Sequence, residues 1–469
     1  MVEKGNYKML SEEERKKLIE KLNLSYYIPE LWEKRESFLN LTEDQYRESI
    51  FDVCSTILIK ILSGDLDDIP RLMSYLPDVG FEDFIKPIIP TIPLREVFRS
   101  LNRLDFLGVS LEPYYGTACG RPSYLNGMHD FSYYGNFILN HKTPTNAIIK
   151  AMYGDIYEQV YNLLAAELLY QRNECYEAMV KITSTIPVLE QKKNTHALFV
   201  ALYLQLSILA INGETKSASL QVQNMRERLA KVSDSNLNYN IDAIEARVAL
   251  YDGNVEFINK WMEELAPDES HDINLLDTYR YFVKLRCYLL YDKHLALISL
   301  AEHLKHFYII GHRTVDALEV DCLLAMSWYK SGKKENAFDI MDSVLETSER
   351  LHIYRYIADE GVLMFKLLQD YQKERGTTPY LDKLIDITRK VAVLYPNYLN
   401  LHESTDTSFT DMEIDILKLL EQGKTYDDVA DIFSISVNTV RYHIKKIYPK
   451  LGVSSASQAI FKAKKMGLI

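Results

Sequence analysis

The sequence predicts an all-α protein, in which a solenoid of helical hairpins is followed by a small domain of four helices. Two observations carry this prediction. Five short segments recur about 40 residues apart, each between two amphipathic helical stretches. The last 60 or so residues hold successive apolar stripes at helical spacing, separated by helix-capping residues. At 469 residues the chain is long enough for two to four domains.

Composition favours a folded, cytoplasmic protein. Hydrophobic residues make up 47% of the chain and charged residues 26%. No apolar run reaches the roughly 20 residues that cross a bilayer, so no membrane contact is expected. Residues 1–21 are rich in Glu and Lys and do not resemble a signal peptide. The odd number of cysteines, without a C-x-x-C pair, favours free core thiols over disulfides or zinc: Cys54, Cys119, Cys175, Cys287 and Cys322.

Charge is segregated near the C-terminus, although the whole chain has a net charge of −12. Residues 406–431 hold eight acidic residues against Lys418 and Lys424. Residues 432–469 contain no Asp or Glu. An acidic protein is a poor partner for phosphates, but a locally basic segment can bind nucleic acid. The basic residues of this segment are Arg441, Lys445, Lys446, Lys450, Lys462, Lys464 and Lys465.

The five recurring segments predict a repeat domain over residues 151–395. Glycines in three of them supply the positive φ that ends a helix. The small or apolar residue five positions later lets a second helix pack closely, as between the helices expected at 197–211 and 220–232. Such hairpins bury their apolar faces by stacking. The unit resembles a tetratricopeptide repeat with long helices, and HEAT-like repeats remain an alternative. The segments end at Ala178, Ala218, Ile258, Ile298 and Ala337, in steps of 40, 40, 40 and 39.

The flanking regions are less regular. Within an N-terminal region, residues 1–150, we expect a helix at 49–62 and a weaker hairpin that ends at 69–76. Residues 111–142 are rich in Gly, Tyr and Pro and are expected to be irregular. Arg121, His129 and Asp130 in this block are interpreted as part of a loop that caps the solenoid, with an inducer pocket as the alternative.

Elements at the end of the repeats are expected as follows. Terminal helices are predicted at 354–371 and 381–395, and the polar residues 396–407 form a linker. Tyrosines on the repeat helices, such as Tyr203, Tyr239 and Tyr279, are interpreted as groove-packing residues rather than ligand contacts.

The remaining residues, 408–469, predict three capped helices in succession. Thr410 and Glu413 form a capping box before a helix that Gly423 ends, and the buried stripe of this helix is Ile416, Leu417 and Leu420. Thr425 caps a second helix at 426–433, in which Val429, Ala430 and Phe433 point inward. After a tight turn, Ser436 caps a third helix.

The third helix has two distinct sides. Val440, Ile444, Ile447 and Leu451 fall on one face at spacings of 4, 3 and 4. A further capping box at Ser455 opens a fourth helix that runs through Lys465. A helix with an apolar back and a basic, hydrogen-bonding front fits the DNA major groove. The front consists of Asn438, Arg441, Tyr442 and Lys445.

This C-terminal stretch closely resembles the LuxR-type (NarL/FixJ) helix-turn-helix DNA-binding domain. The matching residues include Val429-Ala430, Ile435-Ser436, Asn438-Thr439-Val440-Arg441 and Lys450-Leu451-Gly452-Val453-Ser454. The resemblance implies that Arg441, Tyr442 and Lys445 face bases and that the fourth helix pairs in a homodimer. It implies phosphate contacts for Thr425, Tyr426, Asn438, Thr439, His443 and Lys446. A solvated charged face is the alternative for Arg441 and Lys445.

Two positions depart from the family pattern. Pro449 replaces a polar or basic residue in the last turn of the third helix, which removes one backbone hydrogen bond. Tyr442 is bulky for its position, so the bases that it would read do not carry over from relatives, and it could instead shield a phosphate.

The upstream repeats resemble the C-terminal half of MalT-like regulators. The residues that carry this likeness are the helical hairpins, the block 120–127 with Asp130-Phe131, and Ile357-Ala358-Asp359-Glu360-Gly361. Members of that family usually begin with a nucleotide-hydrolysing domain. No G-x-x-x-x-G-K-[ST] motif occurs here, so we expect this chain to lack that domain.

The sequence therefore predicts a transcription regulator that binds double-stranded DNA, with a small-molecule inducer or protein partner in the repeat groove. No catalytic motif, cofactor site or metal site stands out, so an enzyme is not expected. The alternatives are a repeat-based adaptor or scaffold whose C-terminal domain no longer reads DNA, a region like that of a sigma factor, and an enzyme within residues 1–150.

Overall fold

The computed structural model describes most of the chain from residue 31 onward. It covers residues 31–65, 121–127, 130–143, 154–229, 235–311, 313–400, 411–433, 435–451 and 455–466. It also covers residues 67–68, 71–72, 74–75, 145–146, 149, 409, 453 and 468–469. The chain folds as two compact units, residues 1–399 and 400–469. No helix among the described residues is long and apolar enough to cross a membrane.

Three helices come first among the described residues. They are α3 (Arg35–Leu39), α4 (Glu43–Glu48) and α5 (Ile50–Leu62), the last of which was expected at 49–62. Thr42 forms a capping box with Gln45 at the start of α4. Within residues 69–76, where the predicted hairpin ends, only residues 71–72 are described as helical.

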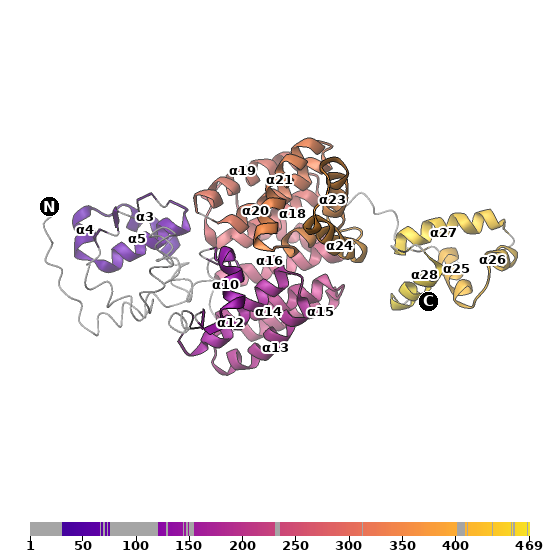
Figure 1. Cartoon of the computed structure of the whole chain (residues 1–469), viewed down its shortest axis with the longest axis horizontal. Helices are drawn as coiled ribbons and strands as arrows, with labels where there is room; N and C mark the ends of the chain where they lie inside the picture. Colours follow the sequence, from indigo (N-terminus) through magenta and orange to yellow (C-terminus); the bar gives the residue numbers. More distant parts are fainter. Residues whose placement is uncertain are drawn as a thin grey trace. The chain divides into compact units, whose positions relative to one another are not determined.

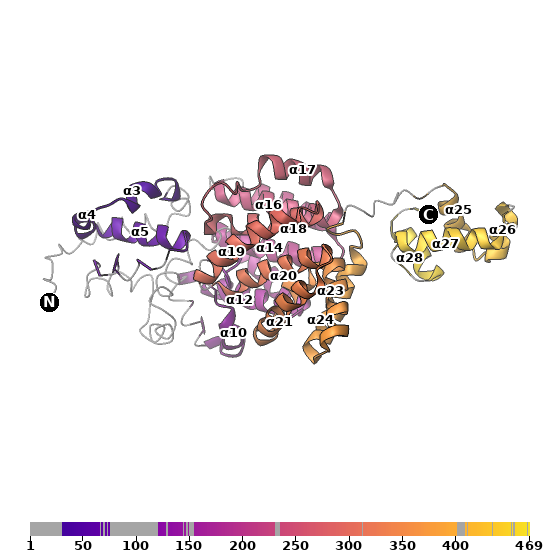
Figure 2. The same ribbon diagram turned by 90° about the horizontal axis from the view of Figure 1, so that it is seen from above.

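Five helical hairpins follow, as the repeats predict. They pair α12 (Tyr157–Gln171) with α13 (Cys175–Gln191), α14 (Thr195–Ile211) with α15 (Thr215–Leu229), α16 (Ser235–Asp252) with α17 (Val255–Glu264), α18 (Thr278–Leu290) with α19 (His294–Ile310), and α20 (Thr314–Lys330) with α21 (Lys334–Leu351). Helix α15 starts five residues before the expected helix at 220–232. The short helix η3 (Leu275–Asp277) precedes α18. Figures 1 and 2 show these pairs stacked in chain order.

One residue with positive φ ends the first helix of every hairpin. Glycine takes this position in three hairpins, with φ between 70° and 83°, and Asn173 and Asp292 take it in the other two. Asn and Asp tolerate this conformation better than other residues with a side chain. The positions are 173, 213, 253, 292 and 332, so the steps are 40, 40, 39 and 40.

This spacing corrects the expected register of the fourth repeat. The residue five positions after the positive φ is fully buried in all five hairpins, and in the fourth it is Leu297. Ile298, which the 40-residue spacing selected, is only partly buried. The third and fourth turns are 39 residues apart instead of 40, so the packing position of the fourth repeat lies one residue earlier than expected.

The two helices of a hairpin differ in burial. Helix α13 buries a single stripe, Ala178, Ile182, Thr185 and Leu189, whereas 12 of the 13 residues of α18 are buried. The first helices contact each other in sequence, α12 with α14, α14 with α16, α16 with α18 and α18 with α20. They therefore form an inner layer, and the second helices cover it from outside (Figure 2).

The last repeat elements close the solenoid onto its first helix. After the short α22 (Arg355–Ala358) come α23 (Gly361–Arg375) and α24 (Pro379–Leu394), which replace the predicted helices at 354–371 and 381–395. The Tyr354 amide donates to the Gln171 carbonyl at 2.8 Å, and Arg355 Nη1 donates to Asn173 Oδ1 at 3.1 Å. Residues near 355 thus lie against the end of α12.

The predicted irregular block is partly helical. Residues 121–127, 130 and 131 form no helix, but η1 (Ser132–Tyr134) and α10 (Gly135–Asn140) follow directly, and η2 (Gly154–Ile156) leads into α12. Residues 111–120 and His129 lie outside the described part. The expected cap loop is in fact an internal plug, because Arg121, Ser123, Asn126 and Asp130 are each at most 4% exposed. We call residues 121–127 and 130 the plug segment.

The C-terminal unit contains α25 (Asp411–Glu421), α26 (Tyr426–Phe433), α27 (Val437–Leu451) and α28 (Ala456–Lys465). These are the four helices that the sequence predicts. Their shared core holds the expected stripes of α25 and α27 and the expected Val429 and Ala430 of α26, together with Ala459 and Ala463 from α28. Phe433 lies at the edge of this core, only partly buried. Of the expected linker at 396–407, residues 396–400 are described, and residues 396–399 form a turn at the end of the first unit.

Candidate nucleic-acid interface and repeat-domain interior

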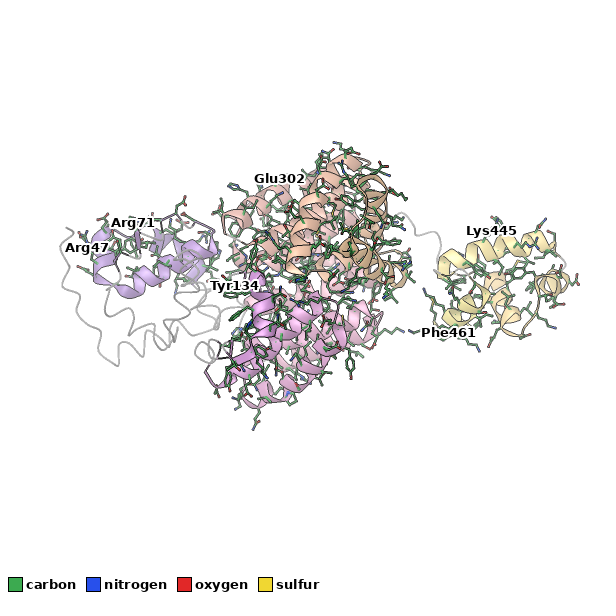
Figure 3. The ribbon with its side chains drawn as sticks, viewed as in Figure 1. Arg47, Arg71, Tyr134, Glu302, Lys445 and Phe461 are labelled. Atoms are coloured by element: carbon green, nitrogen blue, oxygen red, sulfur yellow. The ribbon has the colours of Figure 1, made fainter. Side chains whose placement is uncertain are left out.

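Helix α27 has the two sides that its sequence predicts. Val440, Ile444, Ile447 and Leu451 are at most 6% exposed and hold the helix against α25, α26 and α28. Asn438, Arg441, Tyr442 and Lys445 are exposed on the opposite side. Figure 3 marks Lys445 on α27. A rigid back and a solvent-facing front leave these four side chains available to an external partner.

Capping residues fix the angle at which α27 leaves the turn. Ser436 Oγ accepts a hydrogen bond from the Thr439 amide at 3.1 Å and also contacts the Thr439 hydroxyl at 2.8 Å. Ser455 caps α28 by accepting from the Gln458 amide at 3.3 Å. Both caps are those that the sequence predicts, and each satisfies an N–H at a helix start that has no partner within the helix.

Thr425 and Tyr426, predicted to face phosphates, make contacts within the domain. The Thr425 amide and hydroxyl each donate to Asp428 Oδ2 at 2.8 Å, and Asp428 N donates back to Thr425 Oγ1 at 3.2 Å. The Tyr426 hydroxyl lies 3.1 Å from the Tyr448 hydroxyl on α27. These contacts join α26 to α27 and orient the start of α26.

The other predicted phosphate residues lie along α27. Asn438 is exposed, whereas Thr439 and His443 are partly buried. The His443 ring lies edge-on to the Tyr442 ring, with centroids 5.8 Å apart. The side chain of Lys446 lies outside the described part. Helix α27 continues through Pro449 to Leu451.

Two of the basic residues counted from the sequence are engaged inside the domain. Lys450 Nζ donates to Glu413 Oε2 at 2.6 Å in a largely buried pair, and it lies 5.4 Å from the Phe409 ring centre. Lys464 pairs with Glu421 at 2.7 Å. Arg441 and Lys445 form no ion pair with the described residues. Fewer basic side chains of α27 and α28 are therefore available to an external partner than the sequence count suggests.

Two acidic side chains are exposed at the start of α26. Asp427 and Asp428 are exposed in the first turn of α26, where their negative charges interact favourably with the positive end of the helix dipole. They stand beside Thr425 and Tyr426, so any phosphate held there would meet negative charge.

The interior of the repeat domain carries a network of buried charges. Arg121 of the plug segment donates to Asp316 at 2.6 Å and to Glu319 at 2.7 Å, both on α20. Arg286 on α18 donates to Glu319 and to Glu360, at 2.7 and 2.6 Å. Burial alone would raise the pKa of Glu319, but Arg121 and Arg286 lower this pKa to about 2. Glu319 is therefore ionised and shared by two guanidinium groups.

The plug segment is held at both ends of the inner layer. Ser123 and the amides of Tyr124 and Leu125 donate to Glu167 on α12. Asp130 accepts from the Val315 amide at the start of α20, at 2.9 Å. The segment thus bridges the first and fifth hairpins through the centre of the solenoid.

Sequence reasoning found Arg121 and Asp130 but missed their partners. Glu167, Arg247, Arg286, Asp316 and Glu319 are isolated charges within otherwise apolar helix faces. That placement was the available signal, because a charge on a buried face requires a partner.

Tyr203 and Tyr279 lie together in the groove, as predicted, with ring centroids 5.6 Å apart. Tyr239 differs from the expectation, since it is 42% exposed and stacks against Arg280.

Comparison with known proteins identifies the C-terminal unit. Residues 407–463 match the family model described as bacterial regulatory proteins of the luxR family. These residues form a luxR-family helix-turn-helix domain. The likeness to LuxR-type proteins that the α27 motif predicts is therefore confirmed.

Individual relatives are transcription regulators. The chain is 46% identical over 70 residues to the transcriptional activator protein EsaR of Pantoea stewartii subsp. stewartii, covering 15% of this chain and 28% of EsaR. It is 31% identical over 114 residues to the transcriptional activator protein YukR of Yersinia ruckeri, covering 21% of this chain and 50% of YukR. The chain thus spans half or less of the length of these relatives.

A third relative extends upstream of the luxR-family domain. The HTH-type transcriptional regulator AlkS of Pseudomonas putida is 26% identical over 182 residues, covering 35% of this chain and 20% of AlkS. This match is longer than the luxR-family domain itself, so it includes repeat-domain residues. It supports the likeness of the repeats to those of MalT-like regulators.

Proposed function

We propose that this protein is a sequence-specific, DNA-binding transcription regulator whose luxR-family domain is controlled by the helical-repeat domain. The observation that carries the proposal is the exposed front of α27, formed by Arg441, Tyr442 and Lys445 over a fully buried back. In this proposal these three side chains contact base edges in the major groove. Enzymatic activity is not part of it, and a cytoplasmic location follows from the need to reach DNA.

Phosphate contacts position the domain on the duplex. We assign them to Thr425, Tyr426, Asn438, Thr439, His443 and Lys446. Such contacts contribute affinity without sequence preference and make binding depend on salt. Thr425 and Tyr426 can serve through the exposed start of α26, since their hydroxyls hold that helix end in place.

Dimerisation on DNA is assigned to α28. Phe461 on this helix is 72% exposed, and Met466 directly after it is 55% exposed (Figure 3). Large exposed apolar side chains on one helix suit a symmetric helix pair. In this proposal two copies bind two half-sites.

The repeat domain is assigned the sensory role. Its inner layer surrounds the plug segment and a cavity lined by tyrosines, aliphatic groups and charged side chains. A small inducer or protein partner bound there would alter the access of the luxR-family domain to DNA. The domain divisions proposed are residues 1–150, 151–395, 396–407 and 408–469.

Selection from a random duplex library with the full chain tests the function. The wild-type protein should enrich one motif, and Arg441→Ala should lose roughly 1–3 kcal/mol at one base position. Lys446→Ala should weaken all sequences alike and lower the salt slope by about 1. If no motif is enriched at low salt by a folded chain, the adaptor or scaffold interpretation replaces this proposal.

A further inference from the structure

Residues 425–428, the cap and first turn of α26, hold one side-chain hydroxyl whose proton no group within the turn accepts. Thr425 donates its single hydroxyl proton to Asp428 Oδ2 at 2.8 Å. Asp427 and Asp428 are exposed acidic residues, and ionised carboxylates only accept hydrogen bonds. The remaining side chain is Tyr426, so its hydroxyl is the group of this turn that can still donate.

The Tyr426 hydroxyl lies 3.1 Å from the hydroxyl of Tyr448 on α27. Each of these hydroxyls has one proton to donate and an oxygen that can accept. Their contact uses only one of the two protons. The hydroxyl that accepts therefore keeps its own proton for a further acceptor, and neither hydroxyl has a second partner among the described residues.

Tyr448 lies at the border between the two sides of α27. It follows Arg441 by seven residues and Lys445 by three, so it continues the exposed front toward the end of the helix. Its ring is partly buried and packs against the core of the domain. The core thus fixes the Tyr448 hydroxyl beside the surface that we assign to DNA.

Tyr448 suits the role of donor in this pair. Burial raises the pKa of Tyr448, and its hydrogen bond with Tyr426 raises the pKa further, so this hydroxyl stays protonated at neutral pH. Tyr448 follows the buried Ile447, whereas both chain neighbours of Tyr426, Thr425 and Asp427, are exposed. An acceptor that arrives from solvent therefore meets Tyr426 first.

We propose that Tyr448 is a positioning residue for DNA binding, which donates to the Tyr426 oxygen so that the Tyr426 hydroxyl donates to one phosphate of the duplex. A hydroxyl that accepts a hydrogen bond becomes a stronger donor, and its bond to a phosphate oxygen is charge-assisted. Tyr448 itself contacts no phosphate. This inference deepens the proposed function and rests on it, since it names the residue that orients one of the assigned phosphate contacts.

Replacement of one phosphate at a time tests the proposal, with the purified full chain and the duplex that it selects. A methylphosphonate has a methyl group in place of one anionic oxygen, so binding weakens where the protein contacts that phosphate. At one phosphate the affinity of the wild type should fall about three- to tenfold, the typical net effect of one hydrogen bond. Tyr426→Phe identifies this phosphate, because the loss there should shrink to about twofold or less.

Tyr448→Phe removes one hydroxyl and keeps the ring that packs on the core. The loss at the same phosphate should again shrink to about twofold or less, while the losses at all other phosphates stay as in the wild type. A domain that is merely loosened would bind more weakly without a change confined to one phosphate. If Tyr448→Phe keeps the wild-type pattern of losses, the proposal is wrong and the hydroxyl pair only fastens α26 to α27.

The double variant Tyr426→Phe/Tyr448→Phe shows whether Tyr448 acts through Tyr426. Tyr448→Phe alone should weaken binding of the unmodified duplex about threefold, because one phosphate contact is lost. When Tyr426 already lacks its hydroxyl, the same change should alter the affinity by less than about 1.5-fold. Two losses that multiply in the double variant would show that the hydroxyls act separately, which overturns the proposal.

The matched control is Tyr329→Phe. The Tyr329 hydroxyl donates to Asp370 at 2.9 Å within the repeat domain, so its removal should leave the DNA affinity and the pattern of phosphate losses unchanged. A chain that selects a motif but shows no change at one phosphate in Tyr448→Phe refutes this inference alone. A folded wild-type chain that selects no motif refutes the proposed function, and this inference with it.

Discussion

The Arg121 guanidinium donates a 2.7 Å hydrogen bond to Glu319, a residue 198 positions further along the chain. Both side chains are buried, with side-chain exposures of 5% and 7%. This pair ties the segment that precedes the repeats to the fifth hairpin. The repeats and the plug segment are consequently one folding unit, although the sequence assigns them to separate regions.

Removal of Arg121 should strongly destabilise the repeat domain. Arg121→Gln leaves Asp316 and Glu319 without one of their guanidinium partners, and breaking such a buried pair costs roughly 3–5 kcal/mol. Chemical denaturation followed by circular dichroism measures the change. Arg375→Gln is the matched control, because Arg375 pairs with Glu335 and Asp339 on the surface and should contribute less than about 1 kcal/mol. Equal effects of the two variants would contradict this prediction.

Glu319 should make stability depend on acid pH. Its pKa is about 2 in the folded chain, against 4.5 without the fold. The unfolded chain therefore binds the extra proton first, and the contribution of Glu319 is present above pH 4.5 and lost as the pH falls toward 2. The full loss amounts to roughly 3 kcal/mol. The free energies of unfolding of wild type and Glu319→Gln should converge over this range, and parallel curves would show that Glu319 is not the responsible group.

The positive φ at two turns of the repeat domain should decide whether a substitution there raises or lowers the free energy of unfolding. Gly332 has φ +81° and open space where a Cβ would lie, so Gly332→Ala should cost only the backbone strain, about 1–2 kcal/mol. Lys193 has φ +55° between two hairpins, so Lys193→Gly should gain up to about 1 kcal/mol. The unfolding temperatures of both variants, compared with that of the wild type, check these two predictions. A higher unfolding temperature for Gly332→Ala would be inconsistent with a strained turn.

Neutralising Asp427 should strengthen DNA binding. Its carboxylate is exposed in the first turn of α26, beside Thr425 and Tyr426, which we assign to phosphates. Asp427→Asn should raise affinity about two- to fivefold at low salt, with a smaller gain at high salt, because the repulsion is screened. Fluorescence anisotropy with the selected duplex measures both. Asp415→Asn on α25 is the control and should change affinity less; an unchanged affinity for Asp427→Asn would place phosphates away from the start of α26.

Local patterns predicted much of this molecule. The spacing of Val440, Ile444, Ile447 and Leu451 indicated the buried side of α27 and therefore its exposed front, because both depend only on helical geometry. The hairpin turns were equally predictable, apart from the fourth. There Asp292 replaces glycine, and without that marker the repeat was aligned one residue late.

Long-range pairing was not predictable in the same way. Nothing near Glu167 or Glu319 in the sequence indicates which distant group neutralises it. Lys450 was counted as accessible basic charge, yet it pairs with Glu413, 37 positions earlier. Such partners are chosen by how the helices pack, so a single sequence reveals the unbalanced charge but not its counterpart.

Closure of the solenoid has a consequence for how the chain acquires its structure. In an open array each repeat contacts only its neighbours and can form as soon as they exist. Here Tyr170 on the first inner helix donates to Asp359 at 2.5 Å, a residue 189 positions later. During synthesis the first hairpin therefore leaves the ribosome long before Asp359 is made. The closed solenoid can fold cooperatively only when residues near 360 have emerged.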